Sequence, residues 1–256
     1  MKKTIITIAA LLLVPIISSC YVVQWIPGSG HLVTEERSVS EFHTVDLRGS
    51  GNLYVTQGET QRLSVTTDDN IMPHLRTDVR NGRLVITIEP KLYHPTSLEI
   101  QVTMPKIRGF YLSGSGTIEG QNQLRSDSID VGMSGSGYAN LDLMAKEASM
   151  RLSGSGKLSL NLDVGSLVSN ISGSGKSYLA GQAQSHAYTV SGSGKLRAYD
   201  LMTEETAATI SGSGNCEISV SNSLDVRISG SGSIRYKGNP RIDSRISGSG
   251  SVRPVD

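Results

Sequence analysis

Apolar and polar residues alternate along most of this chain, and the alternating pattern recurs at a nearly fixed interval. The tetrapeptide Ser-Gly-Ser-Gly occurs eight times, starting at Ser113, Ser134, Ser153, Ser172, Ser191, Ser211, Ser229 and Ser247. The residue before every copy is apolar, and so is the residue two places after most copies. Alternation with period two is typical of β-strands. A second period of about 19 residues is typical of a solenoid whose coils stack on one another.

The sequence therefore predicts an all-β solenoid of about eight coils with a period of about 19. Within each coil the two glycines share the parity of the apolar residues, so we expect both to face the interior at a tight bend. The serines have the opposite parity and should form two exposed ladders with about 4.8 Å between coils. A flexible Gly-Ser linker is the alternative interpretation. The apolar residues that flank every copy at fixed parity argue against it.

The region before the regular coils is also β-rich but irregular. We expect residues 108–256 to form the regular coils and residues 38–107 to form irregular N-terminal coils or a hairpin at one end. Arg48-Gly49-Ser50-Gly51 is a partial copy of the repeat. Asn81-Gly82, between two alternating runs, predicts a β-hairpin. Asp69 or Asn70 is a candidate cap for a short helical turn.

The N-terminus has the features of a targeting segment. Lys2 and Lys3 precede an apolar stretch that is too short to span a bilayer comfortably. The stretch ends in Ile17-Ser18-Ser19-Cys20, which resembles a bacterial lipobox. The resemblance implies that residues 1–19 are a lipoprotein signal peptide and that Cys20 is lipidated; an ordinary secretory signal is the alternative. Residues 20–37 then read as a lipidated tether, and the lack of Asp after Cys20 favours the outer membrane or cell surface.

The charge content argues against one class of partner, and the cysteine content argues against a reactive thiol or a disulfide. Only 18% of residues are charged and the formal net charge is +1, so no nucleic-acid partner is predicted. Cys216 falls in an inward column otherwise filled by Leu, Ile, Val, Ala and Ser, which favours a buried structural thiol over a reactive one. No intramolecular disulfide is expected once Cys20 carries lipid.

The sequence has no pattern typical of a catalytic, cofactor or metal site. Gly173-Ser174-Gly175-Lys176-Ser177 resembles the end of a phosphate-binding loop, but strands flank it on both sides and Gly-Ser-Gly-Lys recurs in other coils. The aspartates and histidines are scattered over different column positions, without the paired carboxylates of a glycosidase or the spacing of a zinc site. The sequence therefore predicts no catalytic residues, no cofactor and no metal site.

One outward column is a candidate ligand surface. Lys157, Lys176 and Lys195 each follow the tetrapeptide in three consecutive coils, so we expect them to stack. Outward aromatic and cationic neighbours extend this surface, namely Tyr138, Tyr178 and Arg197. The hypothesis is contact with an anionic or glycan partner; the alternative is a solvated edge that limits aggregation.

Several segments together resemble the auto-transporter adhesin, head GIN domain family of bacterial envelope proteins. They are Arg48-Gly49-Ser50-Gly51-Asn52, the Asp68-Asp69-Asn70-Ile71-Met72-Pro73 turn, Val102-Thr103-Met104-Pro105, the recurring Ser-Gly-Ser-Gly and Tyr236-Lys237-Gly238-Asn239-Pro240. The resemblance covers residues 38–252 and implies a right-handed single-stranded parallel β-helix. It carries no catalytic or ligand residues.

The predicted function is that of a lipid-anchored cell-envelope protein that presents a repetitive β-helix surface, with adhesion implied by the family. The predicted partners are the membrane, through the lipid anchor, and a glycan or a protein. A periplasm-facing structural or sensing component is the alternative, and a carbohydrate-active enzyme is a weaker one. The sequence leaves the ligand, the oligomeric state and the number of strands per coil open.

Overall fold

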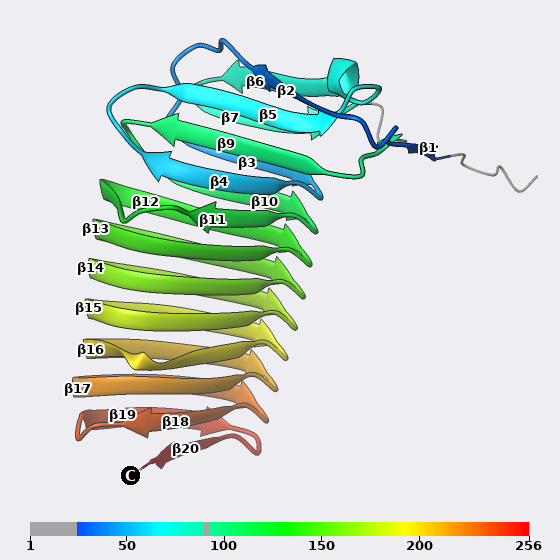
Figure 1. The fold of residues 1–256 in the computed structure, drawn as a ribbon. Helices are drawn as coiled ribbons and strands as arrows, with labels where there is room; N and C mark the ends of the chain where they lie inside the picture. The colour runs from blue at the N-terminus through cyan, green and yellow to red at the C-terminus, as the bar shows by residue number, and fades with distance from the viewer. Residues whose placement is uncertain (1–24, 90–92, 256) are drawn as a thin grey trace, which may run out of the picture.

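The computed structural model describes residues 25–89 and 93–255, and almost all of its regular structure is β-strand (Figure 1). Figure 1 shows a stack of coils with an irregular β region at the N-terminal end and the C-terminus at the other. The predicted signal peptide and Cys20 lie outside the described residues. The elements are β1 (Ile26–Pro27), β2 (Leu32–Glu36), β3 (Thr44–Gly49), β4 (Asn52–Gln57), β5 (Arg62–Asp68), the 3-10 helix η1 (Met72–His74), β6 (Leu75–Arg80), β7 (Arg83–Ile88), β8 (Tyr93–His94), β9 (Leu98–Met104), β10 (Gly109–Gly114), β11 (Thr117–Gly120), β12 (Leu124–Gly135), β13 (Tyr138–Gly154), β14 (Lys157–Gly173), β15 (Lys176–Gly192), β16 (Lys195–Gly212), β17 (Asn215–Gly230), β18 (Ser233–Lys237), β19 (Arg241–Ser247) and β20 (Ser251–Pro254).

The predicted stacking of like residues is confirmed. Strands β12 to β17 pair in parallel, each with the next, and the register joins equivalent positions of successive coils. Leu152 pairs with Ile171, and Ser153 pairs with Ser172. Each coil therefore places its apolar column on the apolar column of the coil before, and the columns form one continuous core.

Each coil has two faces, which the sequence left open. In β13 the buried residues are Ala139, Leu141, Leu143 and Ala145, and then the parity changes: Ala148, Met150 and Leu152 are buried. The change occurs where Lys146 and Glu147 are both exposed. We call the residues after Ser-Gly-Ser-Gly the first face, those after the parity change the second face, and the bend between them the second corner.

The two glycines of each repeat have different roles, and the prediction that both face the interior is wrong for the first. Gly173 has φ +104° and is exposed, and a Cβ atom there would lie 2.8 Å from the carbonyl oxygen of Gly154 in the coil before. Gly175 is buried and faces the interior, where a Cβ atom would lie 2.6 Å from Cδ2 of Leu152. The first glycine is needed for the backbone bend at this glycine corner and the second for space beside an apolar side chain. Both serines are exposed, as predicted.

The partial repeat at Arg48-Gly49-Ser50-Gly51 occupies a true coil position. Strand β3 pairs in parallel with β10, and β4 pairs in parallel with β11, so Gly49 lies beside Gly114 of the first full copy. Strands β7 and β9 add a further parallel layer on β3 and β4. Residues 58–108 thus form an insertion that covers the N-terminal end of the stack.

Strands β2, β5 and β6 at this end, the cap of the stack, pair in antiparallel fashion. Strands β6 and β7 form the predicted hairpin, with Asn81 at φ 51° and Gly82 at φ 70°. Strand β5 pairs with β9 on one side and with β2 on the other. The expected helical turn is present as η1, but its N-cap is Ile71 and no side chain caps it.

The expected tether over residues 20–37 is wrong from Ile26 onward, because this segment is docked on the cap. Strand β1 pairs with β8, and β2 pairs with β5. Asp68 holds the connection: its fully buried carboxylate accepts hydrogen bonds from the backbone N–H groups of Gly30 and Thr96, both at 2.8 Å, and from the Thr96 hydroxyl at 2.7 Å. Burial alone favours the neutral acid, but these hydrogen bonds outweigh it and lower the pKa of Asp68.

Candidate functional site

The three lysines of the predicted ligand surface stack as expected. Lys157 pairs with Lys176, and Lys176 pairs with Lys195, directly after the glycine corner on the first face. All three side chains are exposed. We call this column the lysine ridge. It places three positive charges in adjacent coils, at a strand spacing of about 4.8 Å.

The aromatic residues predicted beside the ridge contact one of these lysines. The Nζ atom of Lys157 lies 5.3 Å from the ring centroid of Tyr138 and 4.7 Å from that of Tyr178. Both distances are within the range of cation–π attraction. These contacts hold the Lys157 ammonium beside both rings and join the two tyrosines to the ridge.

Arg197 of the predicted surface takes part in an ion pair. Its Nη1 atom lies 2.8 Å from Oε2 of Glu217, on the next coil, and the Glu217 side chain is only 18% exposed. The pair is locally neutral. Glu217 was not predicted as a site residue, although its parity and its position one coil after Arg197 are visible in the sequence.

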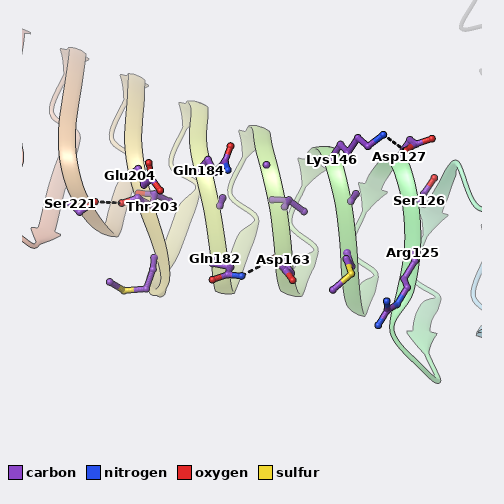
Figure 2. A pocket seen from close by; sticks show the side chains of 16 residues that line it. Arg125, Ser126, Asp127, Lys146, Asp163, Gln182, Gln184, Thr203, Glu204 and Ser221 are labelled. Atoms are coloured by element: carbon purple, nitrogen blue, oxygen red, sulfur yellow. Dashed lines mark hydrogen bonds and ion pairs between the residues drawn. The ribbon is translucent and has the colours of Figure 1, made fainter.

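A large hollow lies at the second corner, which the sequence did not single out. It is a groove of about 900 Å³ whose lining residues come from six consecutive coils. We call it the corner groove. Figure 2 shows Asp127, Lys146, Gln184 and Glu204 along one side and Arg125, Asp163 and Gln182 along the other. Between the two sides, each coil contributes one residue, namely Ser126, Ala145, Val164, Ala183, Thr203 and Ser221.

The polar sides of the corner groove carry both charges and hydrogen-bonding groups. Lys146 Nζ lies 2.8 Å from Asp127 Oδ1, and the hydrogen bond between them raises the pKa of Lys146 and lowers the pKa of Asp127. Gln182 Nε2 donates to Asp163 Oδ1 at 2.8 Å. Met202, 60% exposed, adds an apolar surface. Such a lining offers amides, carboxylates and an ammonium to a ligand, with apolar contact between them.

The second face carries a separate polar network near the cap. The carboxylate of Asp130 accepts hydrogen bonds from Tyr111, from Ser149 and from Arg151, whose Nη1 atom lies 2.9 Å from Asp130 Oδ2. The guanidinium of Arg83 lies 4.2 Å from the ring centroid of Tyr111. The participants come from adjacent coils, so the network ties the cap layer to the first regular coils.

The interior contains titratable groups, and their burial makes them unreactive. Cys216 is buried, as predicted, and burial raises the pKa of its thiol to about 12. Burial lowers the pKa of His186 to about 3, and burial raises the pKa of Tyr188 well above its ordinary value. These side chains are structural and have no access to a ligand.

Across residues 25–89 and 93–255, no three His, Cys, Asp or Glu side chains are grouped so as to hold a metal ion. Within these ranges no helix has the length and apolar character needed to cross a membrane.

A parallel β-solenoid with a capped N-terminal end defines the structural class. Residues 41–240 match the family model "Putative auto-transporter adhesin, head GIN domain", and the chain belongs to this family. A search of curated proteins found no match.

Solved structures agree with the fold. A protein from Parabacteroides distasonis described as a putative lipid binding protein is 27% identical with a TM-score of 0.86, covering 91% of this chain and 100% of its own. A putative adhesin from Bacteroides fragilis is 26% identical with a TM-score of 0.70, covering 90% of this chain and 100% of its own. A putative adhesin from Parabacteroides distasonis, 23% identical with a TM-score of 0.86, covers 91% and 100% and supports the fold alone. These names describe adhesins or a lipid-binding protein and no enzyme.

Proposed function

We propose that this chain is a lipid-anchored protein of the cell envelope that binds an extended polymer along the corner groove and so acts in adhesion. The observation that carries the proposal is the course of this groove, which crosses six consecutive coils. Five steps of about 4.8 Å give a length of about 24 Å. An extended chain of sugars or amino acids fits such a groove better than the convex surface of a globular partner does.

The repeat gives the groove a regular spacing. The coils from β12 to β16 each place residues on both sides of the groove, so an extended ligand meets polar groups at regular steps, although the type of group changes from coil to coil. The family description as an adhesin and the adhesin name of the Bacteroides fragilis neighbour support binding rather than catalysis. The groups that line the groove suit hydrogen bonds to hydroxyls and amides.

A lipid anchor at Cys20 is part of the proposal. The supporting observation is that the docked segment begins at Ile26, which leaves five residues between it and Cys20. Six Cα-to-Cα steps span at most about 20 Å when extended. With lipid on Cys20, the cap end would therefore lie close to the outer membrane and the coils would extend from it.

The lysine ridge is proposed as a second contact surface, for an anionic or glycan partner. Three exposed ammonium groups in register attract phosphate or carboxylate groups, although salt at physiological strength screens this attraction. The test is replacement of Lys157, Lys176 and Lys195 by Ser. Weaker binding to an anionic envelope polysaccharide, with a smaller dependence on salt, is expected. Unchanged binding would leave the ridge as a solvated edge.

The groove is tested on the full chain with Cys20→Ser, so that the protein can be purified without lipid. A variant with Asp163→Ala, Gln182→Ala and Glu204→Ala removes three groove side chains. A matched control with Asn170→Ala, Thr189→Ala and Thr209→Ala changes three stacked outward residues of the second face. Binding is measured to purified envelope polysaccharide and to host matrix components.

The groove variant should bind about tenfold more weakly than the parent, which corresponds to about 1.4 kcal/mol. The control should bind as the parent does. Equal binding by both variants would remove the groove from the proposal, and no binding by the parent would remove the adhesion role.

The alternative role is a structural or sensing component that faces the periplasm. Protease treatment of intact cells separates the two roles. Digestion on intact cells supports adhesion. Protection until the outer membrane is broken would exclude adhesion to an external partner.

A further inference from the structure

Strand β16 departs from the regular coil at one place. Its coil, from Ser191 to Ser211, is 20 residues long, while the three coils before it have 19 residues each. The register with β15 shifts by one residue between Tyr178 and Ala180, and the register with β17 shifts between Ala198 and Met202. Figure 1 shows the resulting kink in β16. Bulges of this kind change the direction of side chains and are enriched beside binding sites.

The irregularity creates a separate hollow on the first face. It has a volume of about 350 Å³, and its lining includes Tyr178, Tyr199, Asn161, Arg197, Asp200 and Glu217. We call it the tyrosine hollow. Both tyrosines are half-buried, so each fixes an apolar ring surface while its hydroxyl end stays near water.

The groups around the tyrosine hollow are held in place before any ligand arrives. Arg197 Nη1 and Glu217 Oε2 lie 2.8 Å apart. The Ser219 hydroxyl donates to the backbone oxygen of Tyr199 at 2.6 Å, which fixes the bulge. Lys237 Nζ lies 4.9 Å from the ring centroid of Tyr199. Prior ordering of this kind lowers the entropy cost of binding.

The tyrosine hollow adjoins the corner groove. Asn161 and Asp163 are successive outward residues of one strand, and the first lines the hollow while the second lines the groove. Ala180 and Gln182 repeat this arrangement on the next coil. Successive outward residues are about 7 Å apart, so one unit of a polymer in the groove can reach into the hollow.

We infer that the tyrosine hollow binds a neutral hexopyranose unit of a glycan, an inference that names the ligand class of the proposed adhesion function and rests on it. A pyranose ring has an apolar C–H face that packs on an aromatic ring and a border of hydroxyls. The hydroxyls can donate to Asp200 and Glu217 and accept from Arg197. These are charge-assisted hydrogen bonds, which are stronger than neutral ones.

The charges of the hollow favour a neutral sugar over an acidic one. Among the residues that line the hollow, Arg197 is neutralised by Glu217, and Asp200 adds one exposed negative charge. Lys157 and Lys237 lie over the rings of Tyr178 and Tyr199 and are not among the lining residues. A uronic acid carboxylate in the hollow would be repelled by Asp200 and would find Arg197 already paired. The lysine ridge has the opposite preference, so the two surfaces can be distinguished by ligand charge.

The sequence offers a matched control for this site. Tyr54 pairs with Glu119, and the same outward column then passes through Asn140 and Ser159 to Tyr178. Tyr54 is therefore a half-buried tyrosine of the same column, outside the tyrosine hollow. Replacing Tyr54 by Ala tests whether sugar binding depends on any tyrosine of this column or only on those of the tyrosine hollow.

The experiment measures binding of methyl hexosides by calorimetry or by saturation-transfer NMR, with the full chain carrying Cys20→Ser. The probes are the gluco, galacto and manno methyl glycosides, an N-acetylhexosamine and, as the charged comparison, glucuronic acid. The variants are Tyr199→Ala, Tyr199→Phe, Asp200→Ala and Tyr54→Ala. Asp200 is exposed, so its replacement leaves the fold intact even if Tyr199→Ala does not fold.

At least one neutral sugar should bind the parent, and it should bind about tenfold more tightly than glucuronic acid. Tyr199→Ala and Asp200→Ala should each weaken this binding by about tenfold, while Tyr199→Phe and Tyr54→Ala retain it. The inference is overturned if no neutral sugar binds the parent, if glucuronic acid binds equally well, or if the folded Tyr199 and Asp200 variants bind as the parent does. Sugar binding without polymer binding would contradict the adhesion role alone.

Discussion

The hydroxyl of Ser169 lies 2.9 Å from Nε2 of His186, and both side chains are buried between the two faces of the solenoid. The two residues stand in adjacent columns of successive coils, where most other coils have aliphatic residues. The ring of Tyr188 lies 5.3 Å from that of His186. An imidazole in these surroundings favours the neutral form, because burial removes it from water and a positive charge there would lose its hydration.

This burial predicts that stability depends on pH through His186. Its pKa falls from 6.5 to about 3 in the folded chain. As the pH falls from about 6.5 to about 3, the unfolded chain takes up a proton that the folded chain does not, so the free energy of unfolding decreases. The expected loss from this residue is about 4 to 5 kcal/mol, and it stops growing below pH 3.

The measurement is urea unfolding at several pH values for the parent and for His186→Leu, since Leu occupies the same column at Leu167 and Leu224. The variant should lose less stability than the parent between pH 6.5 and pH 3. Parallel pH profiles would show that His186 is charged, or solvated, in the folded protein.

The two glycines of one repeat should differ in their tolerance of a side chain. Gly173→Ala requires φ +104° in a residue with a Cβ atom and a contact of 2.8 Å with a backbone oxygen that cannot move alone. Gly175→Ala meets Cδ2 and Cγ of Leu152 at 2.6 and 2.8 Å and the carbonyl oxygen of Gly156 at 3.1 Å, but its φ is not left-handed and the Leu152 side chain can change rotamer. We expect Gly173→Ala, which adds backbone strain to its contact, to cost more than about 3 kcal/mol and Gly175→Ala about 1 to 3 kcal/mol.

Ser174→Ala, between the two glycines, is the control for that pair. Its side chain is exposed, so the free energy of unfolding should change by less than about 0.5 kcal/mol. Chemical denaturation of the three variants measures how much free energy of unfolding each one loses. A larger loss for Gly175→Ala than for Gly173→Ala would contradict the different roles assigned to the two glycines.

Much of this architecture was predictable because each column repeats. Leu152, Ile171 and Val190 stand in one register, and their common parity fixes which side of the strand is buried. The glycine corner was visible for the same reason, since its four residues are the same in every copy. Both features can be read from the spacing and parity of the residues, without knowing which distant residues are in contact.

The features that escaped prediction depend on contacts that do not repeat. The second corner has Lys146, Gly165, Gln184 and Glu204 at equivalent places, so no residue type marks the corner groove. The docked N-terminal segment depends on Asp68, about 40 residues later in the chain, which accepts a hydrogen bond from Gly30. Pro27-Gly28-Ser29-Gly30 by itself reads as a break in structure.

The longer β16 coil was visible as a spacing of 20 residues, but the position of the extra residue was not. Either corner, or any point on the two faces, could have accommodated it. The structure places the shift beside Tyr178 and Tyr199. Spacing alone therefore indicated an irregular coil and left the tyrosine hollow unidentified.

The network at Asp130 should contribute more to stability than an exposed ion pair does. Asp130→Ala removes the acceptor of Tyr111, Ser149 and Arg151 and should cost about 1 to 3 kcal/mol. Asp127→Ala removes the partner of Lys146, where both side chains are more than 80% exposed, and stability should not change measurably. Thermal unfolding of both variants tests the difference, and equal midpoints would show that the network is solvated in solution.

The last coil provides a test of how far stacking, and not the apolar residues themselves, stabilises the solenoid. Ile228 and Ile246 are paired in register in one column, but Ile228 is 2% exposed and Ile246 is 42% exposed. Replacing Ile228 by Ala should cost about 2 to 5 kcal/mol, whereas Ile246→Ala should cost less than about 1 kcal/mol, because little of its surface is removed from water. Urea unfolding at several protein concentrations measures both values. Equal losses that depend on protein concentration would mean that another copy of the chain covers the terminal coil in solution. Equal losses independent of concentration would mean that the coil is buried within one molecule, contrary to the exposure described above.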